Sequence, residues 1–203
     1  MIDETYNKFL NREDALDKLL DVMPLDNLKA KDSILIALSE GGVKLANEIS
    51  SRAGLESDYL FTEYIYSPKN PECKIAIVSE CMDIVVNDLL VKSFDISYDF
   101  IYGEAQRKYE EKILPDIYKF RKGEIISSLD ARNVVIIDDG INSGLRISVA
   151  IKTCTKKNAN TINVATPVIS DDVASVLDTS IDMLYSVYRP KHFVDTKYYY
   201  ESL

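Results

Sequence analysis

The sequence predicts an α/β fold in which an open parallel sheet is flanked by helices. Short apolar runs that are typical of buried strands alternate with stretches in which apolar residues recur at helical spacing. Strands that alternate with helices imply a parallel sheet joined by right-handed crossovers. The chain has 203 residues, of which 46% are hydrophobic and 28% are charged. This length and composition are those of a globular protein with a sizeable core, so we expect one domain over residues 1–203.

The first part of the chain supplies two expected core strands and two helices. Asn11 is a typical N-cap residue, and the helix that follows it ends at Pro24. The apolar run 33–38 predicts a short buried strand, after which Gly41-Gly42 opens a second helix. A second strand is expected over residues 58–65.

The chain departs from this alternation between about residues 66 and 130, where we expect a small subdomain at the edge of the site. Residues 74–79 and 84–86 predict a hairpin with its turn at 80–83. A charged helix is expected over 104–120. Pro115 lies inside it and requires a kink or a restart, because proline lacks the N–H of a helix interior.

The second half returns to alternating strands and helices. Strands are expected over 133–138, 161–168 and 181–187. The helix between the first two carries a clean apolar stripe: Ile147, Ala150, Ile151 and Cys154. Ser170 is expected to cap a short helix, and residues 189–203 form a basic, tyrosine-rich tail.

Composition excludes several classes of protein. No apolar run approaches the roughly 20 residues of a membrane span, and the first eleven residues do not resemble a secretory signal. The three cysteines have no metal-like spacing and His192 is the only histidine, so we expect reduced cysteines in a cytoplasmic protein without a zinc site. The net charge of −9 argues against nucleic-acid binding, which needs a basic face.

The most informative stretch runs from Val134 to Gly144. Four apolar residues predict a buried strand, and Asp138 and Asp139 follow at its carboxyl end, where ligands bind in open α/β sheets. The glycine-containing loop then leads into a helix, whose first N–H groups can hold an anion. Paired carboxylates accept hydrogen bonds from a diol or organise a hydrated Mg²⁺. Together these features suit a sugar phosphate.

This run resembles the phosphoribosyl pyrophosphate (PRPP) loop of the type I phosphoribosyltransferases, in which four apolar residues precede two acids, a Gly or similar, and a Thr-Gly-x-Thr ending. Here Ser143-Gly144 supplies the small-residue step, and Arg146 replaces the last Thr. Further landmarks resemble the predicted phosphoribosyltransferases of bacteria: Arg12-Glu13-Asp14-Ala15, Gly41-Gly42-Val43, Asn70-Pro71-Glu72 and the tyrosine-rich end after Phe193. The resemblance spans nearly the whole chain. It implies a Rossmann-like type I phosphoribosyltransferase fold, in which residues 66–130 form part of the hood that selects the acceptor.

The resemblance also implies site residues. Asp138 and Asp139 would accept from the ribose 2′- and 3′-hydroxyls and hold Mg²⁺, directly or through water. Backbone N–H groups of residues 141–146 and the Ser143 hydroxyl would cradle the 5′-phosphate. The expected PRPP and phosphate loop comprises Gly140, Ile141, Asn142, Ser143, Gly144, Leu145 and Arg146. The Arg146 side chain has two readings: a charge-assisted contact to the ligand, or an outward, solvated position on the helix.

The expected pyrophosphate loop departs from the family pattern. It comprises Ser39, Glu40, Gly41 and Gly42, with glycines expected to permit left-handed backbone geometry and close approach to phosphate. Glu40 stands where the family commonly has Arg, and Glu63-Tyr64 replaces an Arg-Lys pair in a mobile loop ahead of Pro68. Two acids and a tyrosine thus replace three basic groups. We expect weakened or altered pyrophosphate handling with an intact ribose 5-phosphate half, and compensation from one or more of five cations: Arg107, Arg121, Lys122, Arg189 and Lys191.

Three functions remain open from sequence. The first is a Mg²⁺-dependent phosphoribosyltransferase that uses PRPP and an unidentified acceptor. The second is a non-catalytic protein that binds a nucleotide or a ribose phosphate, and the third is another phosphoryl or ribosyl enzyme with a less anionic ligand. His192 is either an acid/base group or structural, and Phe193 either stacks on a base or anchors the tail. Tyrosines 198–200 either pack the tail or form the interface of a homodimer.

Overall fold

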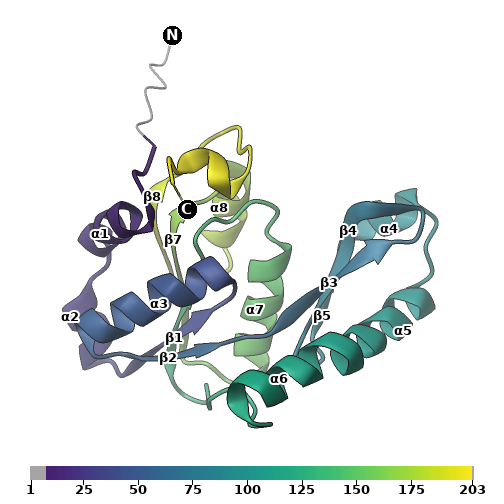
Figure 1. The fold of residues 1–203 in the computed structure, drawn as a ribbon, viewed down its shortest axis with the longest axis horizontal. Helices are drawn as coiled ribbons and strands as arrows, with labels where there is room; N and C mark the ends of the chain where they lie inside the picture. Colours follow the sequence, from purple (N-terminus) through teal and green to yellow (C-terminus); the bar gives the residue numbers. More distant parts are fainter. Residues whose placement is uncertain (1–7, 203) are drawn as a thin grey trace.

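Five parallel strands form the central sheet of the protein, in the order β2-β1-β6-β7-β8 (Figure 1). The structure is a computed structural model that describes residues 8–202. The strands are β1 (Ser33–Ala37), β2 (Glu56–Tyr59), β6 (Asn133–Ile137), β7 (Thr161–Val168) and β8 (Met183–Tyr188). In the register, Ala37 pairs with Ile137 and Ile137 pairs with Ala165, so three strands bring their carboxyl ends to one edge. The predicted α/β fold with a parallel sheet is confirmed.

Helices cover both faces of this sheet because successive strand residues point to opposite sides. Leu35 of β1 packs toward α1 (Arg12–Val22), α2 (Leu25–Ala30) and α3 (Glu40–Ala53). Ile34 and Ile36 pack on the other side, with α7 (Leu145–Lys156) and α8 (Asp171–Leu177). All three strand side chains are fully buried. Burial on both faces accounts for the uninterrupted apolar runs of the central strands.

A second, antiparallel sheet lies between β2 and β6 in the chain, with strand order β3-β4-β5. Its strands are β3 (Thr62–Ser67), β4 (Asn70–Ser79) and β5 (Ile84–Val86). The predicted single strand over 58–65 is therefore wrong, since β2 belongs to the central sheet and β3 to the second one. Leu60 and Phe61 lie at the crossover and are both buried, but Leu60 joins the central core and Phe61 joins the core of the second sheet. The apolar run 59–61 spans the point where the chain changes sheet, so the sequence pattern gave no sign of the change.

The second sheet is covered by one long helical arm and rests on α7 (Figure 1). The arm comprises α5 (Tyr98–Lys108), a π-helical turn (Tyr109–Ile113) and α6 (Leu114–Arg121), and the short α4 (Asp88–Ser93) precedes it. The helix thus starts six residues before the predicted 104, at the N-cap Ser97, whose hydroxyl accepts from Phe100 N at 3.2 Å. Pro115 lies in the first turn of α6, directly after the π turn, so the chain restarts its hydrogen bonding there without leaving the helix.

The described chain ends come together beside the carboxyl edge of the central sheet. Phe9 N donates to Tyr199 O at 2.9 Å, and Glu201 N donates to Phe9 O at 2.8 Å. The tail carries a short 3-10 helix, η2 (Thr196–Tyr199), and the Phe193 ring lies 5.0 Å from the Tyr199 ring. This packing supports the prediction that Phe193 anchors the tail. Within residues 8–202, no helix has the length and apolar character that crossing a membrane requires.

Candidate active site

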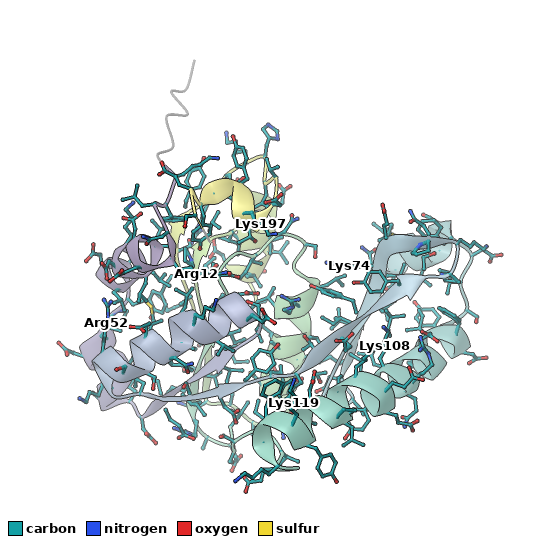
Figure 2. The ribbon with its side chains drawn as sticks, viewed as in Figure 1. Arg12, Arg52, Lys74, Lys108, Lys119 and Lys197 are labelled. Atoms are coloured by element: carbon teal, nitrogen blue, oxygen red, sulfur yellow. The ribbon has the colours of Figure 1, made fainter. Side chains whose placement is uncertain are left out.

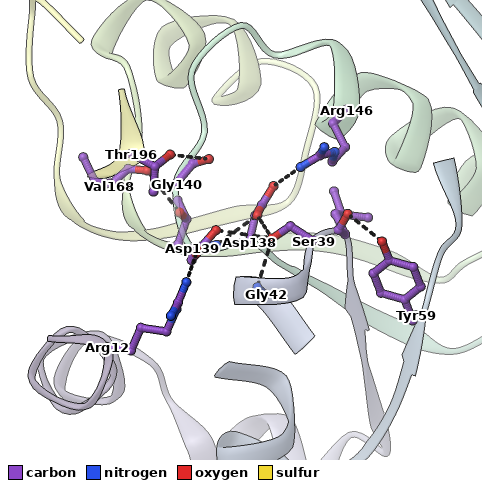
Figure 3. Close-up of polar contacts among 12 residues, drawn as sticks. Arg12, Ser39, Gly42, Tyr59, Asp138, Asp139, Gly140, Arg146, Val168 and Thr196 are labelled. Atoms are coloured by element: carbon purple, nitrogen blue, oxygen red, sulfur yellow. Dashed lines mark hydrogen bonds and ion pairs between the residues drawn. The ribbon is translucent and has the colours of Figure 1, made fainter. Parts of the chain in front are cut away.

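Asp138 and Asp139 lie directly after β6, where the parallel strands end (Figure 3). Asp138 is buried, with 4% of its surface exposed. Its Oδ1 accepts from the Ser39 hydroxyl and from the backbone N of Asp139, the latter at 2.9 Å. The Asp139 carbonyl accepts from the Tyr200 hydroxyl at 2.8 Å. Hydroxyl groups from two distant segments and the local backbone therefore hold the carboxylate pair in place.

Burial makes the carboxyl group of Asp138 a weaker acid than an ordinary aspartate. Removal from solvent raises the pKa of its carboxyl to about 6, against the lowering effects of Arg146 and of the Ser39 hydrogen bond, while the charge of Asp139 adds to the rise. A cation or a pair of hydroxyl donors at this carboxylate would stabilise its charged form. The site is therefore disposed to gain binding free energy from a diol or a hydrated metal ion.

Ser39 and the two glycines after it bring the start of α3 onto the carboxylates. The Ser39 Oγ caps the helix by accepting from Gly42 N at 2.9 Å while donating to Asp138. A Cβ on Gly41 would lie 1.7 Å from Asp139 Oδ2, and one on Gly42 would lie 2.7 Å from Ile137 O. The expectation of left-handed geometry is wrong, because both glycines are helical and neither has positive φ. Glycine is required here for close approach.

Glu40 occupies the first turn of α3, where a carboxylate is favoured by the helix dipole, and its side chain is exposed. Beside it, a cleft of about 600 Å³ opens between α3, β2 and α6. Its aromatic lining residues are Tyr59, Phe61 and Phe120, and its charged ones are Glu40, Lys44, Asp58, Asp116 and Arg121. Tyr59 lines the cleft, and its hydroxyl donates to Leu38 O at 3.4 Å. Burial raises the pKa of this hydroxyl; the charge of Arg146 lowers that pKa, and the charges of Asp138, Asp116 and Glu40 raise it.

The loop after the Asp pair offers unused N–H groups. Gly144, with φ 73°, is the N-cap of α7 and supplies no side-chain cap. The N–H groups of residues 142–146 donate to no acceptor among residues 8–202. Ile141 departs from the prediction, because its N donates to Val168 O at 3.0 Å and its side chain is buried. Consecutive free N–H donors at a helix N-terminus are able to hold an anion.

Arg146 points toward Asp138 and not outward into solvent, and its contact to a ligand stays a prediction. Its Nη1 lies 3.9 Å from Asp138 Oδ2, and its guanidinium lies 5.2 Å from the centre of the Tyr64 ring. Tyr64 belongs to β3, where it pairs with Ile77, so its assignment to a mobile loop is wrong. Glu63 alternates to the other face of the same strand and lies 4.0 Å from Lys108 of α5. The structure thus brings Tyr64 to the site and takes Glu63 away from it.

Two cations at the site escaped sequence reasoning. Arg12, the first residue of α1, approaches Asp139 with Nη2 3.4 Å from Oδ2 (Figure 3). Lys74 of β4 places its Nζ 4.2 Å from the centre of the Tyr64 ring. Arg12 is separated from Asp139 by 127 positions in the sequence. The sequence singled it out only as part of the family landmark that begins at Arg12. Lys74 gave no signal.

Three of the five cations predicted to compensate are engaged elsewhere. Arg107 pairs with Glu104 and Glu111, and Arg189 pairs with Asp178. Arg121 pairs with Glu80. Lys122, Lys191 and His192 have exposed side chains, and the roles suggested for them stay predictions.

The Asp pair could hold a metal ion together with a ligand. Within the described part of the chain, no three His, Cys, Asp or Glu side chains group closely enough to hold a metal ion. Asp138 and Asp139 offer carboxylate oxygens, and Mg²⁺ is commonly held by one or two carboxylates together with substrate phosphates and water. These two residues suit that arrangement.

The chain was compared with protein families, curated proteins and solved structures. No family model matches the chain. Two of its curated relatives are proteins of Mycobacterium tuberculosis strains CDC 1551 and H37Rv named putative phosphoribosyl transferase, each 26% identical over 151 residues. The match covers 74% of this chain and 34% of each relative, so the chain spans about a third of their length.

Solved structures show the fold. A Thermus thermophilus protein, TT1426, superposes with a TM-score of 0.74 at 24% identity, covering 96% of this chain and 90% of its own. A hypoxanthine-guanine phosphoribosyltransferase from Bacillus anthracis superposes with a TM-score of 0.50 at 11% identity, covering 93% and 86%. A Neisseria gonorrhoeae protein with bound ppGpp gives a TM-score of 0.50 at 12% identity, covering 97% and 89%.

Proposed function

Because the chain has the type I phosphoribosyltransferase fold, we propose that it binds PRPP with Mg²⁺ and transfers the phosphoribosyl group to an acceptor. One observation carries this proposal. A fixed pair of carboxylates, Asp138 and Asp139, stands next to a helix N-terminus whose N–H groups have no acceptor among residues 8–202. A diol and a phosphate in one ligand match these two features.

The chain's own residues supply positioning and charge. Asp138 and Asp139 would accept from the ribose 2′- and 3′-hydroxyls, and the N–H groups of residues 142–146 would hold the 5′-phosphate. Loss of pyrophosphate leaves positive charge on the ribose, which the adjacent carboxylates would stabilise. Bound Mg²⁺ would neutralise part of the charge on the departing pyrophosphate.

The cleft beside Glu40 is the proposed entry for the acceptor. The Phe61 and Phe120 rings stack in its wall with centroids 6.1 Å apart, and the Tyr59 ring lies against Phe61 with centroids 4.7 Å apart. Aromatic walls favour a planar acceptor. The segment between β2 and β6 would then act as the hood expected from the resemblance. A Phe120→Ala variant with an unchanged KM for the acceptor would contradict this placement.

Calorimetric titration of the purified protein tests the main proposal. PRPP is titrated with and without Mg²⁺. Ribose 5-phosphate, which is PRPP without its diphosphate, is titrated in parallel. The variant Asp138→Asn/Asp139→Asn should weaken both ligands at least about tenfold, since each lost charged hydrogen bond costs about 1.5–3 kcal/mol. The matched control is Asp171→Asn/Asp172→Asn, an adjacent acidic pair in the first turn of α8. If the wild type binds neither ligand, or if both double variants bind equally well, the proposal fails.

A second function, binding without turnover, is favoured by Glu40. This exposed carboxylate stands at the start of the expected pyrophosphate loop and would repel a diphosphate. Pyrophosphate release measured across a panel of planar acceptors separates the two functions. PRPP binding without release for any acceptor would favour the binding protein, and release would establish the transferase.

A further inference from the structure

Tyr64 carries two cations on its ring. Arg146 of α7 lies 5.2 Å from the ring centre, and Lys74 of the neighbouring strand β4 lies 4.2 Å from it. An aromatic face attracts cations, so Tyr64 can hold both side chains in place. The tyrosine that stands where the family has a basic residue therefore gathers two basic residues around itself.

Lys74 lacks a neutralising partner, and the only carboxylate paired with Arg146 among residues 8–202 is that of Asp138, which the proposed function assigns to the ribose. Lys74 forms no ion pair with any residue of the described chain. The carboxylate nearest to Arg146 is that of Asp138 at 3.9 Å, and the buried Arg146 Nε has no hydrogen-bond partner among residues 8–202. Partial burial and the charge of Arg146 lower the pKa of Lys74, so the two positive charges oppose each other. An anion between them would relieve that opposition.

Neighbouring cations on aromatic rings of the same segment are neutralised. Lys108 lies 6.0 Å from the centre of the Tyr66 ring and 4.0 Å from Glu63. Arg121 lies 4.8 Å from the centre of the Phe61 ring and is paired with Glu80. Figure 2 shows Lys108 beside α5 and Lys74 on the side of the sheet that faces α7. In a chain with a net charge of −9, two cations that share the Tyr64 ring, of which Lys74 has no ion pair among residues 8–202, are a distinct feature.

We propose that Lys74 and Arg146, held by Tyr64, bind the diphosphate group of the ligand. This rests on the proposed function, and it names residues that replace the basic groups missing at Glu40, Glu63 and Tyr64. Arg146 touches Asp138, so the cluster adjoins the carboxylates assigned to the ribose. A ligand with its diol at Asp138 and Asp139 would extend a diphosphate toward Tyr64. The site therefore selects a sugar phosphate that carries a diphosphate over one that does not.

Titration of four variants with three probes tests this. The probes are PRPP, inorganic pyrophosphate and ribose 5-phosphate, each with Mg²⁺ present, and the variants are Lys74→Met, Tyr64→Phe, Tyr64→Leu and the control Lys108→Met. Lys74→Met should lower the affinity for PRPP and for pyrophosphate about tenfold or more. The affinity for ribose 5-phosphate should change by less than about twofold. Tyr64→Phe should bind like the wild type, and Tyr64→Leu should resemble Lys74→Met because the aromatic face is lost. Lys108→Met should leave all three affinities unchanged.

Two results would overturn the inference. One is a wild-type protein that binds PRPP no more tightly than ribose 5-phosphate, and the other is equal PRPP affinity in Lys74→Met and Lys108→Met. Ribose 5-phosphate binding that depends on Asp138 and Asp139 would then leave the proposed function standing without this cluster. Conversely, pyrophosphate binding that depends on Lys74, with no ribose 5-phosphate binding, would keep the cluster and remove the ribose site. Thermal unfolding curves identify any variant that fails to fold.

Discussion

Asp138 is the residue at which stability and function oppose each other. Its carboxyl is buried next to Asp139, and the Ser39 hydroxyl and the Arg146 guanidinium offset only part of that cost. A buried charge is costly unless fully paired, and natural proteins accept such costs at sites that bind or react. The pKa rise from the usual 3.8 to about 6 measures this opposition and leads to a pH-dependent stability.

The pH dependence has a definite sign. Between about pH 4 and pH 6 the folded protein holds a proton at Asp138 that the unfolded chain has released. The free energy of unfolding should therefore fall as the pH rises through this window. Asp138→Asn has no such proton and keeps an acceptor for Ser39, so it should be more stable than the wild type by about 1–2 kcal/mol at pH 7.5 and equal to it near pH 4.

Denaturant unfolding at pH 4, 5, 6 and 7.5 measures this. The control is Asp178→Asn, which removes an exposed carboxyl paired with Arg189 and should retain the wild-type pH profile. A variant at Asp138 that is less stable than the wild type at pH 7.5 would show that the carboxylate is a net stabiliser.

At the scale of elements, one ion pair ties the helical arm to the crossover between the two sheets. Arg121, the last residue of α6, donates from Nη2 to Glu80, and its Nη1 lies 3.8 Å from Asp58 Oδ2. The second Glu80 oxygen accepts from Phe61 N at 3.0 Å. Glu80 is buried, and burial raises the pKa of its carboxyl although Arg121 lowers it. A largely buried ion pair therefore joins the end of the helical arm to the segment that links the two sheets.

Arg121→Met should lower the free energy of unfolding by about 3–5 kcal/mol, because it leaves the Glu80 charge buried without a partner. Adding Glu80→Gln removes that charge, so the double variant should be more stable than Arg121→Met alone. Urea denaturation at pH 7 gives both values. Lys119→Met, an exposed lysine on the same helix, is the control and should change stability by less than about 0.5 kcal/mol. Similar losses for Arg121→Met and Lys119→Met would show that the pair does not hold the arm.

Sequence reasoning located the parts of the molecule that depend on local patterns. The strand before Asp138 and the stripe of α7 follow from periodicity, and both are confirmed. Periodicity failed at Leu60 and Phe61, where adjacent buried residues serve two different cores. Free N–H groups were expected over residues 141–146, and the expectation is wrong at Ile141, whose N–H donates to Val168 O.

The cations of the site were out of reach of sequence reasoning for a different reason. Arg12 and Lys74 reach the site through tertiary packing of α1 and β4, which no local pattern encodes. Glu63 and Tyr64 looked equivalent as replacements for basic residues. Strand alternation separates them, sending Glu63 to Lys108 and Tyr64 to Arg146.

At the scale of the whole molecule, the two ends of the chain support the ligand loop. Phe9 and Tyr200 pack with ring centres 5.3 Å apart, and the Tyr200 hydroxyl donates to the Asp139 carbonyl at 2.8 Å. Thr196 packs on Gly140, where an added Cβ would lie 2.4 Å from Oγ1 and 2.9 Å from Cβ of Thr196. The loop between β6 and α7 thus has its shape set partly by a segment more than fifty residues away.

This contact predicts a coupling between the tail and ligand binding. Gly140→Ala forces Thr196 away from the loop, and overpacking of this kind costs about 1–3 kcal/mol of stability. It should also weaken ribose 5-phosphate binding, since the loop carries the free N–H groups. Thr196→Gly removes the clashing atoms, so the double variant Gly140→Ala/Thr196→Gly should regain affinity that Gly140→Ala alone has lost. Urea denaturation and calorimetric titration of both single variants and the double variant complete the cycle.

The control for this cycle is Gly103→Ala. Gly103 lies inside α5, and an added Cβ there meets nothing within 4 Å, so this variant should bind as the wild type does and be equally or slightly more stable. Affinity losses of Gly140→Ala and Thr196→Gly that simply add in the double variant would show that the tail and the loop act independently. A restored affinity would instead make the tail part of the binding site, acting through the backbone of the loop.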